Sequence, residues 1–231
     1  MVHDRDVNSL KRAAADAAVA LVEDGMIVGL GTGSTAVFVV EAIGKRVRAG
    51  LRVVGVPTSA NTSEQARALG IPLTELTEEM RVDLTIDGAD EVEIDSLDLI
   101  KGRGGALLRE KIVASASERL VIVVDDSKIV ERLGRGALPI EVVPFGWRAT
   151  MHKIRDLDAI PSLRKGPDGS PFISDGGHYI LDCVLSGGCT PASLAPKLDS
   201  VVGLVEHGLF LGMASQVFVG GADGVKVLSR R

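Results

Sequence analysis

Three carboxylates gather directly behind a short apolar run, in the segment Asp87-Gly88-Ala89-Asp90-Glu91. Carboxylates in this arrangement can bind a metal ion, hold sugar hydroxyl groups or transfer protons. A transition-metal site is disfavoured because no histidine lies nearby in the sequence to complete a ligand set. A solvated acidic turn explains the same residues equally well, so the segment alone does not decide its role.

A glycine-rich turn with hydroxyl residues follows an earlier apolar run, in the stretch GLGTGST at 29–35. Glycine lets the backbone approach a ligand closely, and free N–H groups at a helix start near Ser34 and Thr35 favour an anion. The stretch is not a dinucleotide fingerprint, because Ser34 replaces the third glycine of G-x-G-x-x-G, and no P-loop lysine follows. It fits a phosphate monoester, although a plain strand-to-helix turn with serine as N-cap fits too.

A second glycine loop, KGRGG at 101–105, carries Lys101 and Arg103 into a predicted helix. Glu110 falls near the first two turns of that helix, where a carboxylate can point back into the same cleft as the loop. Glu110 and Lys111 can also be read as a surface charge pair. The glycine setting of Lys101 is unusual for a plain solvated loop, which favours a functional role for this lysine.

Lys128 ends the segment DDSK at 125–128, which follows an aliphatic run at 120–124. The lysine could reach the same cleft and counter a phosphate charge, and a solvent-facing position is equally compatible with the sequence. No Ser/His/Asp constellation is evident. Four histidines lack any partner at metal-ligand spacing and are interpreted as structural or surface residues: His3, His152, His178 and His207.

Apolar runs and helical patterns alternate along the first part of the chain. This alternation predicts βαβ units and a parallel sheet whose strands are buried on both faces. Ligands bind such sheets at the carboxyl ends of the strands, where we expect the loops 31–35, 87–90 and 101–105 to converge. The expected strands are 26–30, 51–56, 82–86 and 120–124. The first expected helix runs from Asn8 or Ser9 to about residue 24, and the second follows the turn 31–35 and ends at about residue 49. The third covers 59–69, and the fourth begins at the glycine loop 102–105 and ends at about residue 117.

From about residue 138 the elements become shorter, and prolines and glycines interrupt them. Apolar strand character returns over residues 208–220. We therefore predict an α/β fold, in which residues 1–135 and 206–231 form a Rossmann-like catalytic domain with a parallel sheet and residues 136–205 form a smaller α+β lobe. The expected strands of the lobe are 140–143, 179–185 and 202–205, and its expected helices are 147–156 and 192–198.

The composition of the 231 residues narrows the classes of function. The net charge is -5 without a block of basic residues, which argues against a nucleic-acid partner. No apolar run reaches the roughly 18 residues of a membrane span, so no membrane partner is expected. Cys183 and Cys189 are predicted to be free thiols, because no secretory signal is apparent, and the expected location is the cytoplasm.

Six segments in the same order resemble the A-type ribose-5-phosphate isomerases, over roughly residues 10 to 228. Any one of these segments is weak evidence, whereas six in order are highly specific. They are GLGTGSTA at 29–36, TIDGADEV at 85–92, KGRGGALLREKI at 101–112, VVDDSK at 123–128, VEHGLF at 205–210 and DGVKVL at 223–228.

The resemblance implies a cofactor-free and metal-free enzyme of the pentose phosphate pathway that isomerises ribose 5-phosphate and ribulose 5-phosphate through an enediolate. Glu110 is implied as the base, assisted by Asp87, Asp90 and Lys101, and the family usually forms homodimers or homotetramers. Arg103 is a departure, because the family commonly has glycine there. The implied substrate contacts are Thr32, Gly33, Ser34, Thr35, Asp87, Gly88, Ala89, Asp90, Lys101, Gly102, Arg103, Gly104 and Lys128, together with Lys11.

Two other classes of protein compete with this interpretation. A transcription regulator that senses sugar phosphates would need a DNA-binding module, and too few residues precede the first predicted strand to hold a helix-turn-helix. A coenzyme A transferase would use a glutamate as a nucleophile rather than as a base. A covalent acyl adduct at Glu110 would discriminate the transferase from the isomerase.

Overall fold

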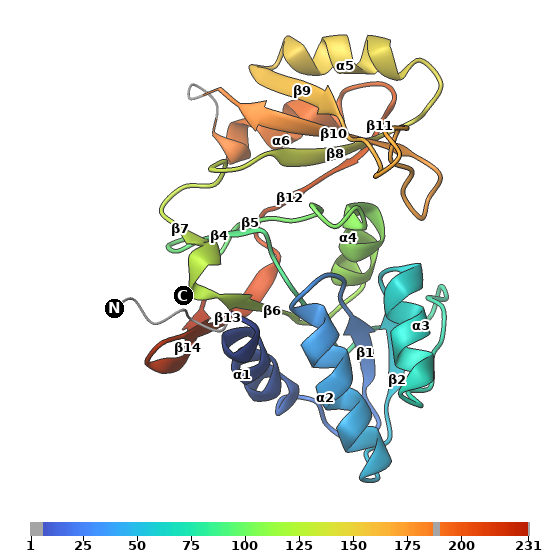
Figure 1. Cartoon of the computed structure of the whole chain (residues 1–231), viewed down its shortest axis with the longest axis vertical. Helices are drawn as coiled ribbons and strands as arrows, with labels where there is room; N and C mark the ends of the chain where they lie inside the picture. The colour runs from blue at the N-terminus through green and yellow to red at the C-terminus, as the bar shows by residue number, and fades with distance from the viewer. Residues whose placement is uncertain (1–6, 187–189, 231) are drawn as a thin grey trace.

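The computed structural model describes residues 7–186 and 190–230, and Figure 1 shows them as a larger lower part and a smaller upper lobe. The largest sheet of the described chain has six strands in the order β14-β13-β6-β3-β1-β2. Neighbouring strands are parallel except for the hairpin pair β13 and β14, so the predicted parallel sheet is confirmed. The strands are β1 Ile27–Leu30, β2 Val54–Pro57, β3 Leu84–Asp87, β6 Leu120–Asp125, β13 Ala214–Gly221 and β14 Gly224–Ser229.

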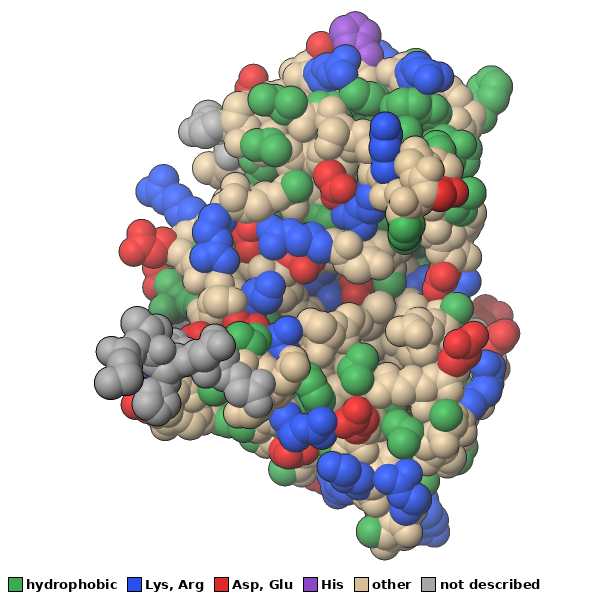
Figure 2. All heavy atoms as spheres, viewed as in Figure 1, with side chains coloured by type: hydrophobic (Ala, Val, Ile, Leu, Met, Phe, Trp, Pro, Cys, Tyr) green, Lys and Arg blue, Asp and Glu red, His purple; other side chains and the backbone are tan. Residues whose placement is uncertain are grey.

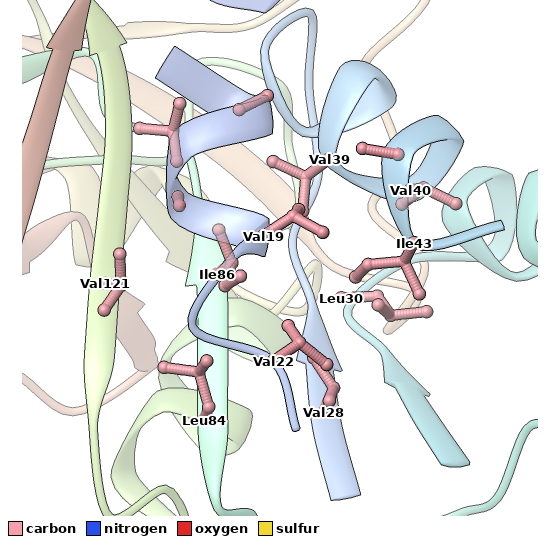
Figure 3. Close-up of a cluster of buried hydrophobic side chains, with 14 of the residues drawn as sticks. Val19, Val22, Val28, Leu30, Val39, Val40, Ile43, Leu84, Ile86 and Val121 are labelled. Carbon is pink, nitrogen blue, oxygen red and sulfur yellow. The ribbon is translucent and has the colours of Figure 1, made fainter. Parts of the chain in front are cut away.

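Helices bury both faces of this sheet. Alternate side chains of a strand point to opposite faces, and in β6 the side chains of Val121 and Val123 join one apolar cluster whereas Ile122 joins another. Helices α1, α2 and α3 pack on the first face. Aliphatic side chains of α1 and α2 lie there against those of β1 and β3 (Figure 3). Helix α4 packs on the other face through Val113 and Ala114. The helices are α1 Val7–Val19, α2 Ala36–Arg48, α3 Ala60–Ala68 and α4 Leu107–Ser115.

Helix α1 is shorter than the sequence predicts, since it ends at Val19 rather than near residue 24. The backbone N–H groups of Leu21 and Val22 bond to carbonyls three residues back, on Ala18 and Val19, which tightens and closes the last turn. The other helices expected in this part of the chain are present within a few residues of their predicted ends, except that α4 begins only at Leu107, beyond the glycine loop.

A second, irregular sheet lies between the two parts, with the strand order β12-β5-β4-β7. Its strands are only two or three residues long, and of these only β12 lies in a segment, residues 208–220, for which the sequence predicted strand character. They are β4 Glu91–Glu93, β5 Leu99–Ile100, β7 Ile129–Val130 and β12 Leu209–Phe210. The loop 101–105 therefore leaves β5 of this sheet, and not a strand of the parallel sheet as predicted.

The smaller lobe is an antiparallel sheet in the order β11-β8-β10-β9, packed against two helices. Strand β9 was missed in the sequence, where Pro161 interrupts the apolar pattern. Strand β11 pairs with β8, and therefore extends the lobe two residues past the predicted boundary at 205. The elements are β8 Leu138–Val142, α5 Trp147–Arg155, β9 Ala159–Leu163, β10 Tyr179–Leu185, α6 Pro191–Asp199 and β11 Leu204–His207.

Cys183 is buried in the lobe as a free thiol, and burial raises its pKa to about 12. Cys189 lies outside the described residues. None of the described helices is both long enough and apolar enough to cross a membrane.

Two adjacent glycines in β13 provide a matched test of how closely α1 packs on the sheet. A Cβ on Gly220 would lie 2.1 Å from the carbonyl oxygen of Leu10, whereas a Cβ on Gly221 would meet its nearest atom at 3.7 Å. We expect Gly220→Ala to lower the free energy of unfolding by about 1–3 kcal/mol, because α1 must move. Gly221→Ala should change it by less than about 0.5 kcal/mol. Urea denaturation measures both, and equal effects would contradict the close contact.

Candidate active site

A cavity of about 240 Å³ opens where the loops after β1, β3 and β6 meet the glycine loop 101–105 and helix α4. These three strands are neighbours in the sheet, so their carboxyl ends bring distant segments together. The lining comprises most of the residues singled out in the sequence: Thr32, Gly33, Ser34, Thr35, Gly88, Ala89, Asp90, Lys101, Gly102, Gly104, Glu110 and Lys128. A larger hollow of about 740 Å³ beside α3 contains none of these residues.

Asp87 ends β3 beside β1, at the point where the strand order reverses, and it lies behind the lining residues of the cavity rather than among them. Its side chain is 1% exposed, and its Oδ1 atom accepts hydrogen bonds from the backbone N–H groups of Thr32, at 3.0 Å, and Gly88, at 2.7 Å. A Cβ on Gly31 would lie 2.1 Å from this Oδ1 atom. Only glycine at position 31 therefore lets the loop after β1 approach the carboxylate.

Lys101 places a buried ammonium group beside two carboxylates. Its Nζ atom lies 3.0 Å from Asp87 Oδ2 and 3.4 Å from Glu110 Oε2, and it donates a hydrogen bond to the Gly88 carbonyl at 2.6 Å. Burial lowers the pKa of Lys101, but Asp87 and Glu110 more than offset this effect and hold the pKa above its ordinary value. Lys101 is therefore a fixed cation at neutral pH.

Glu110 lies in the first turn of α4 and is only 4% exposed. Its Oε2 atom has no hydrogen-bond partner among the described residues. Burial raises the pKa of Glu110 to about 8; Lys101 opposes the rise, whereas Asp87 and Asp90 add to it. A carboxyl group with such a pKa can both accept and return a proton near neutral pH. The alternative of a surface pair with Lys111 is wrong, because Lys111 bonds to Glu206.

The adjacent carboxylates of Asp90 and Glu91 have different surroundings. Asp90 faces the cavity, and its Oδ2 atom accepts a hydrogen bond from the Arg103 backbone N–H at 2.9 Å. Glu91 is fully buried in β4 and receives the Arg103 side chain at 2.7 Å. The Arg103 guanidinium thus points away from the cavity, and a substrate contact by this side chain remains only a prediction.

The opposite end of the cavity has the features of an anion site. Within the described residues, the backbone N–H groups of Gly33, Ser34 and Thr35 have no acceptor, and they precede helix α2. Lys11 reaches this turn from α1 and donates to the Ser34 hydroxyl at 2.9 Å, while Lys128 lines the same cavity. Free amides at a helix start, together with lysines, favour a phosphate group.

Thr32 supports the turn rather than offering its polar groups to the cavity. Its N–H is used by Asp87, and its hydroxyl lies 2.7 Å from that of Thr58 and 2.8 Å from that of Ser59. Basic and acidic side chains are interspersed over the face of the molecule seen in Figure 2. On this face, the attraction for an anion therefore comes from the local turn and its lysines rather than from a broad basic surface.

One contributor to the site had no assigned role in the sequence. The ring of Phe210, fully buried in β12, lies beneath the ammonium groups of Lys101, at 5.4 Å, and Lys111, at 5.0 Å. The motif VEHGLF at 205–210 was the sequence signal that could have identified Phe210.

No three His, Cys, Asp or Glu side chains of the described chain gather in a way that could hold a metal ion.

Comparisons with known proteins agree with this geometry. The family described as ribose 5-phosphate isomerase A (phosphoriboisomerase A) matches residues 54–224. Proteins named ribose-5-phosphate isomerase A from Gloeobacter violaceus and from a Synechococcus strain are 58% and 52% identical; the alignments cover 97% and 96% of this chain and 97% of each relative.

Solved structures of isomerases have the same fold. The ribose 5-phosphate isomerase A of Methanocaldococcus jannaschii superposes with a TM-score of 0.92 at 39% identity, over 96% of this chain and 99% of that chain. A D-ribose-5-phosphate isomerase in complex with phospho-erythronic acid gives a TM-score of 0.93 at 36% identity, over 97% and 100%. Together with the family match, these similarities show that the chain belongs to the ribose 5-phosphate isomerase A family.

Proposed function

We propose that this protein interconverts D-ribose 5-phosphate and D-ribulose 5-phosphate, with Glu110 as the base that moves a proton between C2 and C1. The observation that carries the proposal is the buried Glu110 carboxylate, which lines the cavity. Among the described residues its Oε2 atom has no hydrogen-bond partner, and the Lys101 ammonium lies 3.4 Å away. A complex of a family member with phospho-erythronic acid, a small sugar-acid phosphate, supports a sugar phosphate as the ligand.

The open-chain aldose loses its C2 proton to Glu110, and the electrons move onto the O1 oxygen to form an enediolate. Glu110 then returns the proton to C1, which gives the ketose, while the hydroxyl proton passes from O2 to O1. Lys101 remains protonated, so it stabilises the negative charge on these oxygens as a fixed cation rather than by giving up a proton. Asp87 holds Lys101 in place, and Asp90 is placed to hold a substrate hydroxyl.

The phosphate of the substrate binds at the turn formed by Gly33, Ser34 and Thr35, with Lys11 and Lys128 beside it. Binding energy from this remote group holds the reacting carbons against Glu110. The cavity of about 240 Å³ is smaller than the roughly 300–1,000 Å³ of sites for drug-sized ligands. This size supports a pentose phosphate and disfavours the coenzyme A thioester of the transferase alternative.

We further propose a homodimer or homotetramer located in the cytoplasm. The exposed apolar side chains of Phe145 and Val202 on the smaller lobe support an assembly, and the free thiol of Cys183 supports a reducing compartment.

The role of Glu110 is tested by Glu110→Gln, which keeps the shape of the side chain but removes the base. We expect kcat to fall about 10²–10⁴-fold, while KM changes much less because the phosphate site is intact. Glu118→Gln, a control on a carboxylate that is 56% exposed, should leave both constants unchanged. Solvent deuterium should enter the substrate with the wild type and with Glu118→Gln, but not with Glu110→Gln. A folded Glu110→Gln protein with near-normal kcat would place the base elsewhere, with Asp87 and Asp90 the next candidates.

The raised pKa of Glu110 predicts the pH dependence of the reaction. A base works only when deprotonated, so kcat/KM should rise about tenfold per pH unit below the pKa and level off above about pH 8. The second ionisation of the substrate phosphate, near pH 6, is a separate and lower step. A pH profile of kcat/KM checks this, and a single midpoint at the ordinary carboxyl value of about pH 4.3 would contradict it.

The phosphate site is tested by Lys11→Met, which removes the charge but keeps much of the side-chain volume. KM for ribose 5-phosphate should rise about tenfold, which corresponds to about 1.4 kcal/mol, while kcat stays within about twofold. Lys45→Met provides a matched control, since Lys45 is exposed in the last turn of α2, at the end of the helix away from Ser34, whereas Lys11 bonds to Ser34. Steady-state kinetics would refute the assignment if both variants kept the wild-type KM.

A further inference from the structure

A side chain of the smaller lobe, Arg164, forms hydrogen bonds with the backbone of the glycine loop at the active site. Arg164 directly follows β9, and its Nη1 atom donates hydrogen bonds to the carbonyl oxygens of Gly102, at 3.3 Å, and Arg103, at 2.9 Å. These two carbonyls belong to the loop between Lys101 and Glu110. The contact therefore joins a part of the chain about 60 residues away to the backbone that lines the cavity.

Arg164 is itself held rigidly. Asp182 in β10 accepts from both its Nε atom, at 2.9 Å, and its Nη2 atom, so the guanidinium and the carboxylate form a two-point pair. The Phe172 ring lies 5.7 Å from the guanidinium carbon, and the same ring fills the space beside Gly105. The Arg164 side chain is 14% exposed. A planar guanidinium fixed at two points leaves its remaining nitrogen aimed in one direction, towards the loop.

The two hydrogen bonds from Arg164 constrain the direction of the loop amides. The Gly102 carbonyl also accepts from the Gly105 N–H at 2.9 Å, whereas the stronger bond from Arg164, at 2.9 Å, goes to the Arg103 carbonyl. The described chain has no cis peptide bond, and in a trans peptide the C=O and the N–H point to opposite sides. The peptide of Gly102 obeys this rule, because its carbonyl faces Arg164 while the N–H of Arg103 faces Asp90. The next peptide has its carbonyl on Arg164 as well, which turns the Gly104 N–H towards the cavity that Gly104 lines.

The Gly104 N–H has no acceptor among the described residues. It lies in the same cavity as Lys101 and Glu110, where the charge of an enediolate develops. A carbonyl that accepts from a charged guanidinium is polarised, which makes the N–H of the same peptide a stronger donor. An amide fixed in this way before the reaction is the kind of group that stabilises an oxyanion.

We propose that Arg164, clamped by Asp182, is a positioning residue for the isomerisation: it holds the glycine loop so that the Gly104 N–H is presented to the enediolate. The inference rests on the proposed function. It implies that the smaller lobe contributes to the rate of the reaction, because Arg164 acts through the loop backbone and does not touch the substrate.

The test compares Arg164→Ala with Arg155→Ala, which removes an exposed arginine on α5 of the same lobe. For Arg164→Ala we expect kcat to fall about 10–100-fold, somewhat less than the loss of a whole oxyanion donor, with KM within about threefold. The Kd of phospho-erythronic acid, whose planar carboxylate resembles the enediolate, should rise by a similar factor. The Kd of inorganic phosphate should stay within about twofold, and Arg155→Ala should match the wild type throughout.

A merely structural role predicts a different pattern, in which thermal stability falls but kcat and the ratio of the two Kd values stay at wild-type levels; this result would overturn the proposal. If Arg164→Ala does not fold, Asp182→Asn carries the test, because it loosens the clamp without removing Arg164. It should show a smaller fall in kcat and the same selective loss of phospho-erythronic acid, and unchanged values would refute the inference. A wild-type protein that fails to isomerise ribose 5-phosphate would instead refute the proposed function.

Discussion

The ion cluster of Lys101, Asp87 and Glu110 is the constraint around which the rest of the structure is arranged. Three ionisable groups that are each less than 5% exposed lose their hydration, and close pairing and hydrogen bonds offset that cost. The protein supplies these through the backbone, because the N–H groups of Thr32 and Gly88 bind Asp87 and the Gly88 carbonyl binds Lys101. Such contacts require the loops after β1 and β3 to touch.

One atom of this cluster, Glu110 Oε2, is less well stabilised than the others. Asp87 has partners for both of its oxygens, whereas among the described residues Glu110 Oε2 has the Lys101 ammonium at 3.4 Å and no hydrogen-bond partner. Burial of Glu110 outweighs the opposing effect of Lys101, and it raises the pKa of this carboxyl group towards the working range of a base. The same lack of partners leaves the oxygen open to a substrate. The unpartnered oxygen of Glu110 thus lowers the stability of the folded protein locally, and it also makes Glu110 able to act as a base.

The site also depends on segments outside the parallel sheet. Lys101 follows β5, and its backbone N–H bonds to the Gly208 carbonyl, which is close to β12 and the Phe210 ring. Strands of two residues cannot be stable alone, so this irregular sheet exists only because the two parts of the protein enclose it. Lys101 and the glycine loop are thus placed by contacts from both parts rather than by the parallel sheet.

The sequence by itself determined the elements whose cause is local. Aliphatic runs long enough to be buried on both faces predicted β1, β3 and β6, and the position of Glu110 after a glycine loop predicted its place on α4. Tertiary structure alone decided that Glu91 turns from its neighbour Asp90 to Arg103 and that β5 and β12 pair. These outcomes depend on which distant segment lies opposite, and a periodic pattern of side chains carries no information about partners that are remote in the chain.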